Sequence, residues 1–476
     1  MKTIVWFRQD LRLSDNPALS YAAERGAIIP VCILDDGGRP LGGASRWWLH
    51  KSLAALKDDL PQLTLLRGDP LEALNKLIDE TGADAVCWNR CYEPHAIARD
   101  KRIKAALRER DLEVRSFNGA LLVEPWEVKT GQGGPFKVYS PFWRAAKARD
   151  VATPLAVPKL DIDAPRGIGD DVDDWNLLPS SPNWAAGWED IWQPGEAGAQ
   201  AQLDRFLDDG LAGYGTLRDR PDKTNVSRLS PHLHWGEISP RQIWSRTQFL
   251  ADREPAHRKD IDKFLSEIGW REFSYHLLYH FPSLPEENWR PAFDAYPWRD
   301  DIVELEAWQK GQTGYPLVDA GMRELWQTGY MHNRVRMVTA SFLVKHLRLH
   351  WSHGEAWFWD TLLDADLANN AASWQWVAGC GADAAPYFRI FNPMTQSEKF
   401  DPEGAYVRRW CPELARLDDK AIHAPFKATE ATLSAAGVVL DSTYPRPIVD
   451  HTAARAAALA GYEAVKAAGR PIDSTI

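Results

Sequence analysis

Two carboxylates, two amides and two tryptophans lie within thirteen consecutive positions of the chain, between segments that read as helices. They are Asp364, Asp366, Asn369, Asn370, Trp374 and Trp376. This density of polar and aromatic groups indicates a bound ligand rather than a plain core. If residues 370–378 form a helix, the two tryptophans are about 200° apart around its axis. One ring could then face the protein and the other a cleft, although both could equally be core aromatics.

A second pair of side chains suits a flat ligand. Glu267 and Trp270 are three positions apart, so on a helix a carboxylate and a large ring share one face. The acid could hydrogen-bond to the edge of a heterocycle while the ring supports its side. An ordinary ion pair between Glu267 and Arg271, four positions apart, explains these residues equally well.

Hydroxyl side chains precede Pro231, a residue type that favours the first turn of a helix. They lie in residues 224–230 together with an arginine. Hydroxyls and free backbone amides at a helix N-terminus suit a phosphate or pyrophosphate group. The more common alternative is an ordinary serine N-cap.

A third segment separates a polar helix face from a core face. Asn333 and Met337 share one side, which Arg334 borders. The core stripe consists of Val335, Val338 and Phe342. Within residues 323–350 the local charge is 5 − 1 = +4, although the whole chain carries −10. This local excess is either a binding surface for an anion or a solvated helix face.

The composition is typical of a globular protein with more than one domain. Its 476 residues are 45% hydrophobic and 26% charged. No apolar run approaches the roughly 18 residues that a membrane span needs. Because the chain also enters a strand-like segment at once, we expect no signal peptide, no anchor and a cytoplasmic location. Five cysteines without a Cys-x-x-Cys pair favour a reducing compartment, and we expect no iron–sulfur cluster or other metal.

Short strand-like and helix-like segments alternate through the first part of the chain. Strands are predicted at 3–7, 27–34, 63–66, 85–88 and 113–117, and helices at 17–25, 44–59, 70–81 and 95–109. This alternation predicts a doubly wound parallel sheet of the α/β, Rossmann-like class in residues 1–130. No strand leads into a Gly-x-Gly-x-x-Gly turn, so the main cofactor should bind elsewhere. Residues 131–200 read as an interdomain linker and 201–476 as an all-helical domain.

Five segments together resemble the photolyase/cryptochrome family. They are Trp6–Arg12, Trp270–Phe273, Met331–Arg334, Asp366–Asn370 and Ala385–Pro393, in the order and spacing of that family. Among the branches of the family, the chain is most similar to the microbial cyclobutane pyrimidine dimer (CPD) DNA photolyases.

The resemblance implies light-dependent DNA repair by a deoxyribodipyrimidine photo-lyase. Residues 1–130 would be the antenna-binding domain, and residues 201–476 would bind flavin adenine dinucleotide (FAD) and DNA. Reduced FAD excited by blue light would pass an electron to a dimer flipped out of UV-damaged DNA, single- or double-stranded. The dimer would split into two pyrimidines and return the electron. We expect a monomer.

The family's cofactor-binding residues match a set that extends over the second half of the chain: Tyr214, Ser227, Leu229, Ser230, Asn333, Arg336, Asp364, Asp366 and Asn370. Asn370 matches the amide that faces flavin N5. Plant-type cryptochromes resemble this site with an aspartate there, so Asn370 favours repair over signalling.

The resemblance also assigns catalytic, lesion-binding and electron-transfer residues. It gives catalytic roles to Glu267, Asn333 and Asn370. Its lesion- and DNA-binding positions match Arg218, Glu267, Trp270, Asn333, Arg334, Met337 and Trp376. Its photoreduction chain matches Trp298, Trp351 and Trp374.

The chain departs from the family pattern in a few places. Val226 stands where many relatives have threonine, and Phe264 replaces a common tryptophan. Relatives that repair (6-4) photoproducts have histidines where this chain has Asn333 and Met337, so no proton donor for that lesion is expected. His332 should point to another face.

Two further expectations follow from the resemblance. A blue-light photoreceptor of the cryptochrome type, which signals through a protein partner, is the alternative function, but the chain shows no long disordered output segment. A second, light-harvesting chromophore is expected between the domains. Glu93 resembles a position that contacts folate, so a folate such as methenyltetrahydrofolate is preferred over a deazaflavin.

Overall fold

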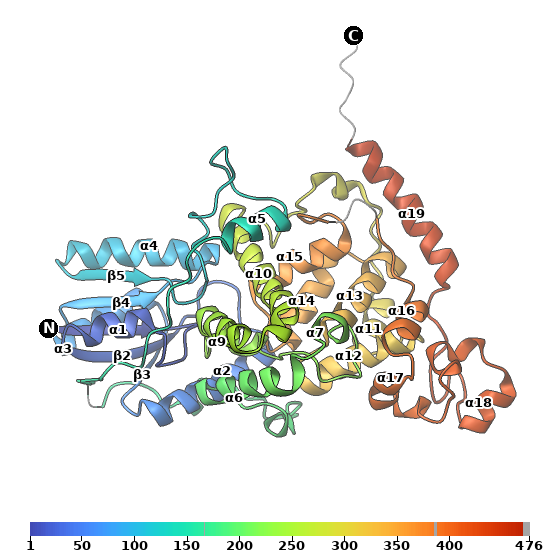
Figure 1. Cartoon of the computed structure of the whole chain (residues 1–476), viewed down its shortest axis with the longest axis horizontal. Helices are drawn as coiled ribbons and strands as arrows, with labels where there is room; N and C mark the ends of the chain where they lie inside the picture. The colour runs from blue at the N-terminus through green and yellow to red at the C-terminus, as the bar shows by residue number, and fades with distance from the viewer. Residues whose placement is uncertain (166, 385–387, 470–476) are drawn as a thin grey trace, which may run out of the picture. The chain divides into compact units, whose positions relative to one another are not determined.

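The computed structural model describes residues 1–165, 167–384 and 388–469 (Figure 1). By their internal contacts, the residues form two compact units. The first unit contains residues 1–215, 226–282 and 363–368, and the second contains residues 216–225, 283–362 and those from 369 onward. The predicted linker 131–200 therefore belongs to the same unit as the sheet. The predicted domain boundaries at 130 and 200 stay a prediction.

The first unit contains a parallel five-stranded sheet, as predicted. Its strands are β1 (Lys2–Phe7), β2 (Ala27–Leu34), β3 (Thr64–Arg67), β4 (Ala85–Asn89) and β5 (Glu113–Phe117), in the order β3-β2-β1-β4-β5. The helices between them are α1 (Pro17–Ala23), α2 (Gly43–Asp59), α3 (Pro70–Thr81) and α4 (Pro94–Glu109). The central strands are apolar along nearly their whole length because the sheet is covered on both faces.

The strand order reverses beside β1, and such a switch point is the usual ligand crevice of a doubly wound sheet. The segments that leave β1 and β4 meet there, and Gln9 donates from Nε2 to Oε1 of Glu93 at 3.1 Å. Glu93 is buried, with 7% of its surface exposed. A buried carboxylate at this position is suited to hydrogen-bond a polar ligand.

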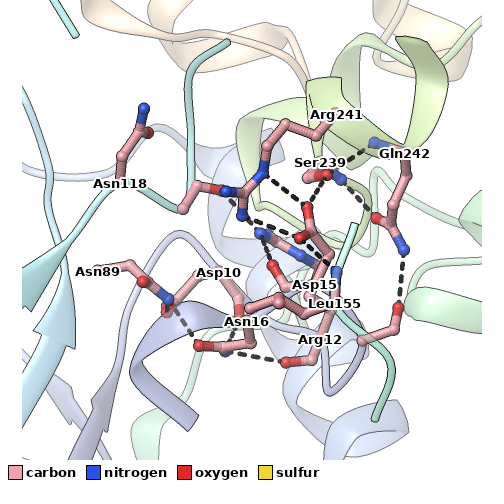
Figure 2. A network of polar contacts seen from close by, with 12 residues as sticks. Asp10, Arg12, Asp15, Asn16, Asn89, Asn118, Leu155, Ser239, Arg241 and Gln242 are labelled. Carbon is pink, nitrogen blue, oxygen red and sulfur yellow. Dashed lines mark hydrogen bonds and ion pairs between the residues drawn. The ribbon is translucent and has the colours of Figure 1, made fainter. Parts of the chain in front are cut away.

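A buried polar network joins the loop after β1 to later helices of the same unit (Figure 2). The guanidinium of Arg12, which is fully buried, donates to the carbonyls of Asp15, Gly119 and Gly236 at 2.6–2.7 Å. Asp15 in turn forms an ion pair with Arg241 at 2.9 Å. The Asp-Leu-Arg part of the first resemblance segment therefore has a structural role, because it ties the sheet to the helical part of this unit.

The remaining helices of the first unit include one that the sequence did not predict. Helix α5 (Tyr139–Ala146) lies within the predicted linker, and its buried residues Tyr139, Phe142, Trp143 and Ala146 follow helical spacing. This short stripe was hidden among residues rich in proline and glycine. The other helices are α6 (Glu196–Arg205), α8 (Ser230–His234), α9 (Pro240–Arg253) and α10 (Arg258–His280). Helix α7 (Tyr214–Leu217) begins in the first unit and ends in the second.

The described part of the second unit is helical, as predicted. Its helices are α11 (Ile302–Gln309), α12 (Pro316–Thr328), α13 (Asn333–Ser341), the π-helix η6 (Phe342–Leu347), α14 (Trp351–Thr361), α15 (Leu367–Ala378), which begins in the first unit, α16 (Pro393–Phe400), α17 (Ala405–Trp410), α18 (Glu430–Ala436) and α19 (His451–Ala468). Residues 385–387 of the Ala385–Pro393 segment lie outside the described residues. All five cysteines are free thiols. Among the described residues, no helix has the length and hydropathy to cross a membrane.

Candidate functional site

The hydroxyl-rich segment ahead of Pro231 lies in the first unit from Val226 onward and reaches a distant carboxylate. Helix α8 starts at Ser230 with Pro231 in its first turn, as predicted. The Ser230 hydroxyl donates to Oδ2 of Asp364 at 2.5 Å, and the N-cap position belongs to Leu229. The alternative of an ordinary serine N-cap is therefore wrong. The structure brings together Ser230 and Asp364, two residues that the family resemblance assigns to one ligand.

Backbone contacts hold the rest of this segment. The side-chain amide of Gln202 donates to the Ser227 carbonyl at 2.8 Å, and the Leu229 N–H donates to the Ser227 hydroxyl oxygen at 3.4 Å.

Tyr214 packs edge-on against Phe264 with 5.7 Å between ring centroids. Phe264, which replaces a tryptophan common among relatives, thus supports a residue of the predicted cofactor site.

A histidine that the sequence analysis did not single out lies on the same helix as Ser230. His234 is four positions after Ser230 and only 5% exposed. Neither of its ring nitrogens has a hydrogen-bond partner within the described parts of the chain, and the same holds for the indole nitrogen of Trp235. Burial lowers the pKa of His234, although Asp366, Glu93 and Asp364 are close enough to oppose the shift.

These orphaned polar atoms fit a bound polar cofactor. A neutral imidazole presents one donor and one acceptor, and an indole presents one donor. Leaving such groups buried without a partner costs about 1–3 kcal/mol each, so a ligand or ordered water is expected beside them. The carboxylates and hydroxyl beside α8 add acceptors and donors for the same ligand.

The carboxylate and ring predicted to share a face of α10 do so, but the ion pair differs from the expected one. Glu267 pairs with Lys263 at 3.1 Å, one turn earlier, while Arg271 donates to the Ala120 carbonyl at 2.8 Å. The Trp270 ring stacks on Tyr139 with 3.7 Å between centroids and 8° between planes. Stacking fixes the orientation of the indole before any ligand arrives.

Helix α13 of the second unit separates its faces as predicted. Asn333, its first residue, is exposed, Met337 is half-buried, and the core residues Val335, Val338 and Phe342 are at most 1% exposed. Arg336 donates from Nε to the Met331 carbonyl at 2.7 Å. The polar face of this helix is therefore accessible to a ligand.

The histidine next to Asn333 is unsuited to donate a proton at neutral pH. His332 is 3% exposed, and its Nδ1 accepts the backbone N–H of Arg334 at 3.1 Å. Burial lowers its pKa to about 4, against a smaller opposing effect of Asp219. A neutral imidazole cannot serve as the acid that (6-4) photoproduct repair is expected to need.

The two predicted phosphate-binding arginines meet at one aspartate in the second unit. Asp219 lies 2.9 Å from Nη2 of Arg334 and 3.9 Å from Nε of Arg218. The guanidinium of Arg334 also lies over the Phe400 ring, 4.5 Å from its centroid.

Asn370 is held by a neighbouring helix. Its Nδ2 donates to Oε1 of Glu355 at 2.8 Å and to the Glu355 carbonyl at 3.0 Å. Four and six positions later on α15, the two tryptophans have different surroundings, as predicted. Trp374 is 2% exposed and packs on Phe358 at 4.9 Å, whereas Trp376 is half-buried.

Two of the three predicted electron-transfer tryptophans, Trp351 and Trp298, are joined by a series of ring contacts in the second unit, and the third, Trp374, packs on the helix that begins with Trp351. The Trp374 ring packs so closely against Gly354 that a Cβ atom at position 354 would lie 2.0 Å from it. Gly354 is one turn after Trp351 on α14. His350 bridges the other two, with its ring 5.2 Å from Trp351 and 5.0 Å from Trp298. Trp374 and Trp351 are buried and Trp298 is half-buried, so the series runs toward the surface.

The sequence did not indicate three of these residues: His234 in the first unit, and Asp219 and Glu355 in the second. Asp219 directly follows Arg218, so the sequence already placed a negative charge beside a predicted phosphate-binding arginine. The two other residues carried no such signal, because their importance depends on which distant group each one meets.

The chain matches two protein-family models. Residues 3–159 match the model described as DNA photolyase, and residues 264–464 match the FAD binding domain of DNA photolyase. A deoxyribodipyrimidine photo-lyase of Agrobacterium fabrum is 55% identical over 97% of this chain and 98% of its own. Cryptochrome-1 of Arabidopsis thaliana is 40% identical over 95% of this chain and 69% of its own.

A solved structure gives the same relationship. The crystal structure of a bacterial class III photolyase from Agrobacterium tumefaciens is 55% identical, with a TM-score of 0.95 over 98% of each chain. The chain therefore belongs to the photolyase/cryptochrome family.

Proposed function

We infer that this chain is a light-dependent DNA-repair enzyme, a deoxyribodipyrimidine photo-lyase that splits cyclobutane pyrimidine dimers with reduced FAD. The observation that carries the proposal is the amide at position 370 in a chain 55% identical to a photo-lyase over nearly its whole length. Plant-type cryptochromes, which resemble this site, have a carboxylic acid there.

FAD would be held by the residues that match the family's cofactor site and by two added from the structure. They are Tyr214, Ser227, Leu229, Ser230, Asn333, Arg336, Asp364, Asp366 and Asn370, with His234 and Trp235. When bound and reduced, FAD supplies the electron that light transfers to the dimer and that returns after the ring splits. Hydroxyls at the start of α8 suit its phosphates, and the buried donors of His234 and Trp235 suit its hydroxyl or ring heteroatoms.

The remaining residues would bind DNA and the dimer. Arg218 and Arg334 contact phosphates largely independently of sequence. Trp270 and Trp376 cover the apolar cyclobutane side of the flipped dimer, Met337 packs beside it, and Glu267 and Asn333 hydrogen-bond its polar edges. These side chains also exclude water from the reacting bases.

Trp374, Trp351 and Trp298 would carry an electron from the surface to oxidised FAD. Photoreduction restores the reduced cofactor and is separate from repair itself. Support for this role comes from the aromatic series through His350 and from the family resemblance.

The direct test is light-dependent loss of dimers from an oligonucleotide that carries one CPD. The FAD-loaded protein should restore the two pyrimidines under blue light and not in the dark. An oligonucleotide with a (6-4) photoproduct should stay unrepaired, because Asn333 and Met337 provide no imidazole to donate a proton to that lesion. Light-dependent binding of a protein partner without loss of dimers would instead support the cryptochrome-type photoreceptor.

A second chromophore would bind at the switch-point crevice beside Glu93. The buried carboxylate suits the amino-pyrimidine edge of a folate, which we prefer over a deazaflavin. The absorption spectrum tests this proposal. A bound folate should give a band in the violet that disappears in Glu93→Ala and remains when FAD is removed. We further propose that the enzyme acts as a monomer in the cytoplasm.

A further inference from the structure

Asp219 lies between two arginines that the proposed function assigns to DNA phosphates. Its carboxylate is 2.9 Å from Nη2 of Arg334 and 3.9 Å from Nε of Arg218. The Asp219 side chain is 33% exposed, and the two arginine side chains are 19% and 11% exposed. The three residues form a half-buried cluster. Its net charge is +1, whereas the two arginines alone would carry +2.

The position of Arg334 does not depend on Asp219 alone. Its guanidinium lies over the Phe400 ring at 4.5 Å, and its backbone N–H donates to Nδ1 of His332 at 3.1 Å. Ring stacking holds the plane of a guanidinium in place without using its donors. Replacing the carboxylate of Asp219 with an amide should therefore change the charge of the cluster more than its geometry.

We propose that Asp219 is a specificity-determining residue that suppresses binding of undamaged DNA. This inference rests on the proposed function, because it requires Arg218 and Arg334 to contact phosphates. Binding of undamaged DNA is almost wholly electrostatic and responds to each phosphate that the protein neutralises. Asp219 competes with phosphate for the same guanidinium donors, so part of this attraction is lost.

Damaged DNA loses less from this competition. A guanidinium has five N–H donors in a fixed fork, so a phosphate in a suitable orientation can bind beside the carboxylate. The backbone around a flipped dimer is held in one orientation by the dimer in its pocket, whereas undamaged duplex slides through many orientations. Asp219 thus penalises the mobile complexes more than the specific one.

The test compares Asp219→Asn with wild type in binding undamaged and dimer-containing oligonucleotides at several salt concentrations. The variant should bind undamaged DNA about 3- to 10-fold more tightly at low salt, with a slope of log K against log salt steeper by about 0.9. Affinity for dimer-containing DNA should rise by a smaller factor, so the specificity ratio falls. Equal factors for both DNAs, or an unchanged salt slope, would overturn the inference.

Two further variants separate the possible causes. Asp441→Asn removes one charge from another Asp–Arg pair of 2.9 Å, with Arg446, and should leave the salt slope unchanged. A similar change in slope there would show a general charge effect and overturn the role of Asp219. Arg334→Gln should weaken binding of both DNAs. If Arg334→Gln weakens binding while Asp219→Asn has no effect, only the specificity inference fails. If Arg334→Gln does not weaken binding, the proposed phosphate contact of Arg334 fails as well.

Discussion

Glu355 fixes the direction in which the side-chain amide of Asn370 faces. Both hydrogens of the Asn370 amide are used, one on the carboxylate and one on the backbone carbonyl of Glu355. The amide oxygen is therefore directed away from Glu355 as an acceptor. Both residues are buried, at 4% and 8% exposed, so water does not compete for these contacts. In the proposed role of facing the flavin, Asn370 would therefore offer an acceptor and no acid.

Substitution Asn370→Asp should turn this acceptor into a proton donor. The new carboxyl would lie about 3 Å from the carboxylate of Glu355, and two such groups so close cannot both ionise, so one of them holds a proton with a raised pKa. The absorption spectrum of the flavin after illumination should then depend on pH between about 6 and 9, unlike that of wild type. Dimer repair should fall by at least 10-fold.

The second substitution Glu355→Gln provides the control for this effect. In the Asn370→Asp background it removes the like charge, so the pKa of the new carboxyl should return toward its ordinary value of about 4. The pH dependence should disappear from the range of 6 to 9. Persistence of that dependence in the double variant would show that the carboxyl pair is not its cause.

Loss of Trp351 should separate photoreduction from repair. Trp351→Phe removes the indole that contacts His350 and its 2.8 Å hydrogen bond to Asn288, a change expected to destabilise the fold by about 1–3 kcal/mol. Photoreduction of oxidised FAD should slow at least 10-fold, measured by flavin absorption under blue light with an external reductant. Repair by protein whose FAD was reduced chemically should stay near the wild-type rate.

A matched tryptophan outside the series supplies the comparison. Trp308 is fully buried and 6.1 Å from Trp374, but within the described parts of the chain its ring has no aromatic contact with Trp351, His350 or Trp298. Trp308→Phe should photoreduce at close to the wild-type rate. Equal losses in both variants would mean that electrons do not follow the predicted route.

The sequence predicts the secondary-structure elements of this protein much better than it predicts which distant side chains contact each other. Alternation of strands and helices identified the sheet to within two residues at each boundary, because apolar periodicity is a local signal. The two-position step from Trp374 to Trp376 likewise predicted their different surroundings. The partner of Asn370 is fifteen positions away on another helix, and Ser230 meets Asp364 across 134 positions, so local patterns gave no indication of either contact. Helix α5 was missed because its eight residues are too few to show a clear period.

His234 and Trp235 should contribute to FAD retention. Trp235→Phe keeps the ring and removes only the indole N–H, and His234→Leu keeps the volume while it removes both nitrogens. Loss of one hydrogen bond between neutral groups weakens binding by about 0.5–1.5 kcal/mol, or about 2- to 10-fold. Bound FAD per protein after dilution and gel filtration measures the effect. The control Trp244→Phe, at a half-buried tryptophan of helix α9, should leave FAD retention unchanged. If His234→Leu and Trp235→Phe also leave it unchanged, water and not FAD satisfies the buried nitrogens of His234 and Trp235.

The buried carboxyl of Glu272 should make stability depend on pH around neutrality. Burial raises its pKa from the ordinary 4.5 to about 7, against the opposing effect of Arg271, 3.5 Å from Oε1, and of the backbone N–H groups of Leu122 and Val123, which donate to Oε2 at 3.0 and 3.3 Å. Because the folded state binds the proton more tightly than the unfolded state, this group contributes full stability below pH 4.5, and the contribution is lost as pH rises through about 7. The rise in pKa corresponds to about 3 kcal/mol once the carboxyl is ionised in the folded state.

The substitution Glu272→Gln isolates this contribution. Glutamine keeps an oxygen for the two backbone donors and cannot ionise, so the denaturant midpoint of wild type should fall relative to that of the variant between pH 5 and pH 8. The difference between the two proteins removes the effect of other groups such as His276, whose pKa burial lowers to about 4. Glu306→Gln, at an exposed ion pair with Lys310, should show no such pH-dependent difference. A constant difference between Glu272→Gln and wild type across this range would mean that Glu272 titrates at its ordinary pKa.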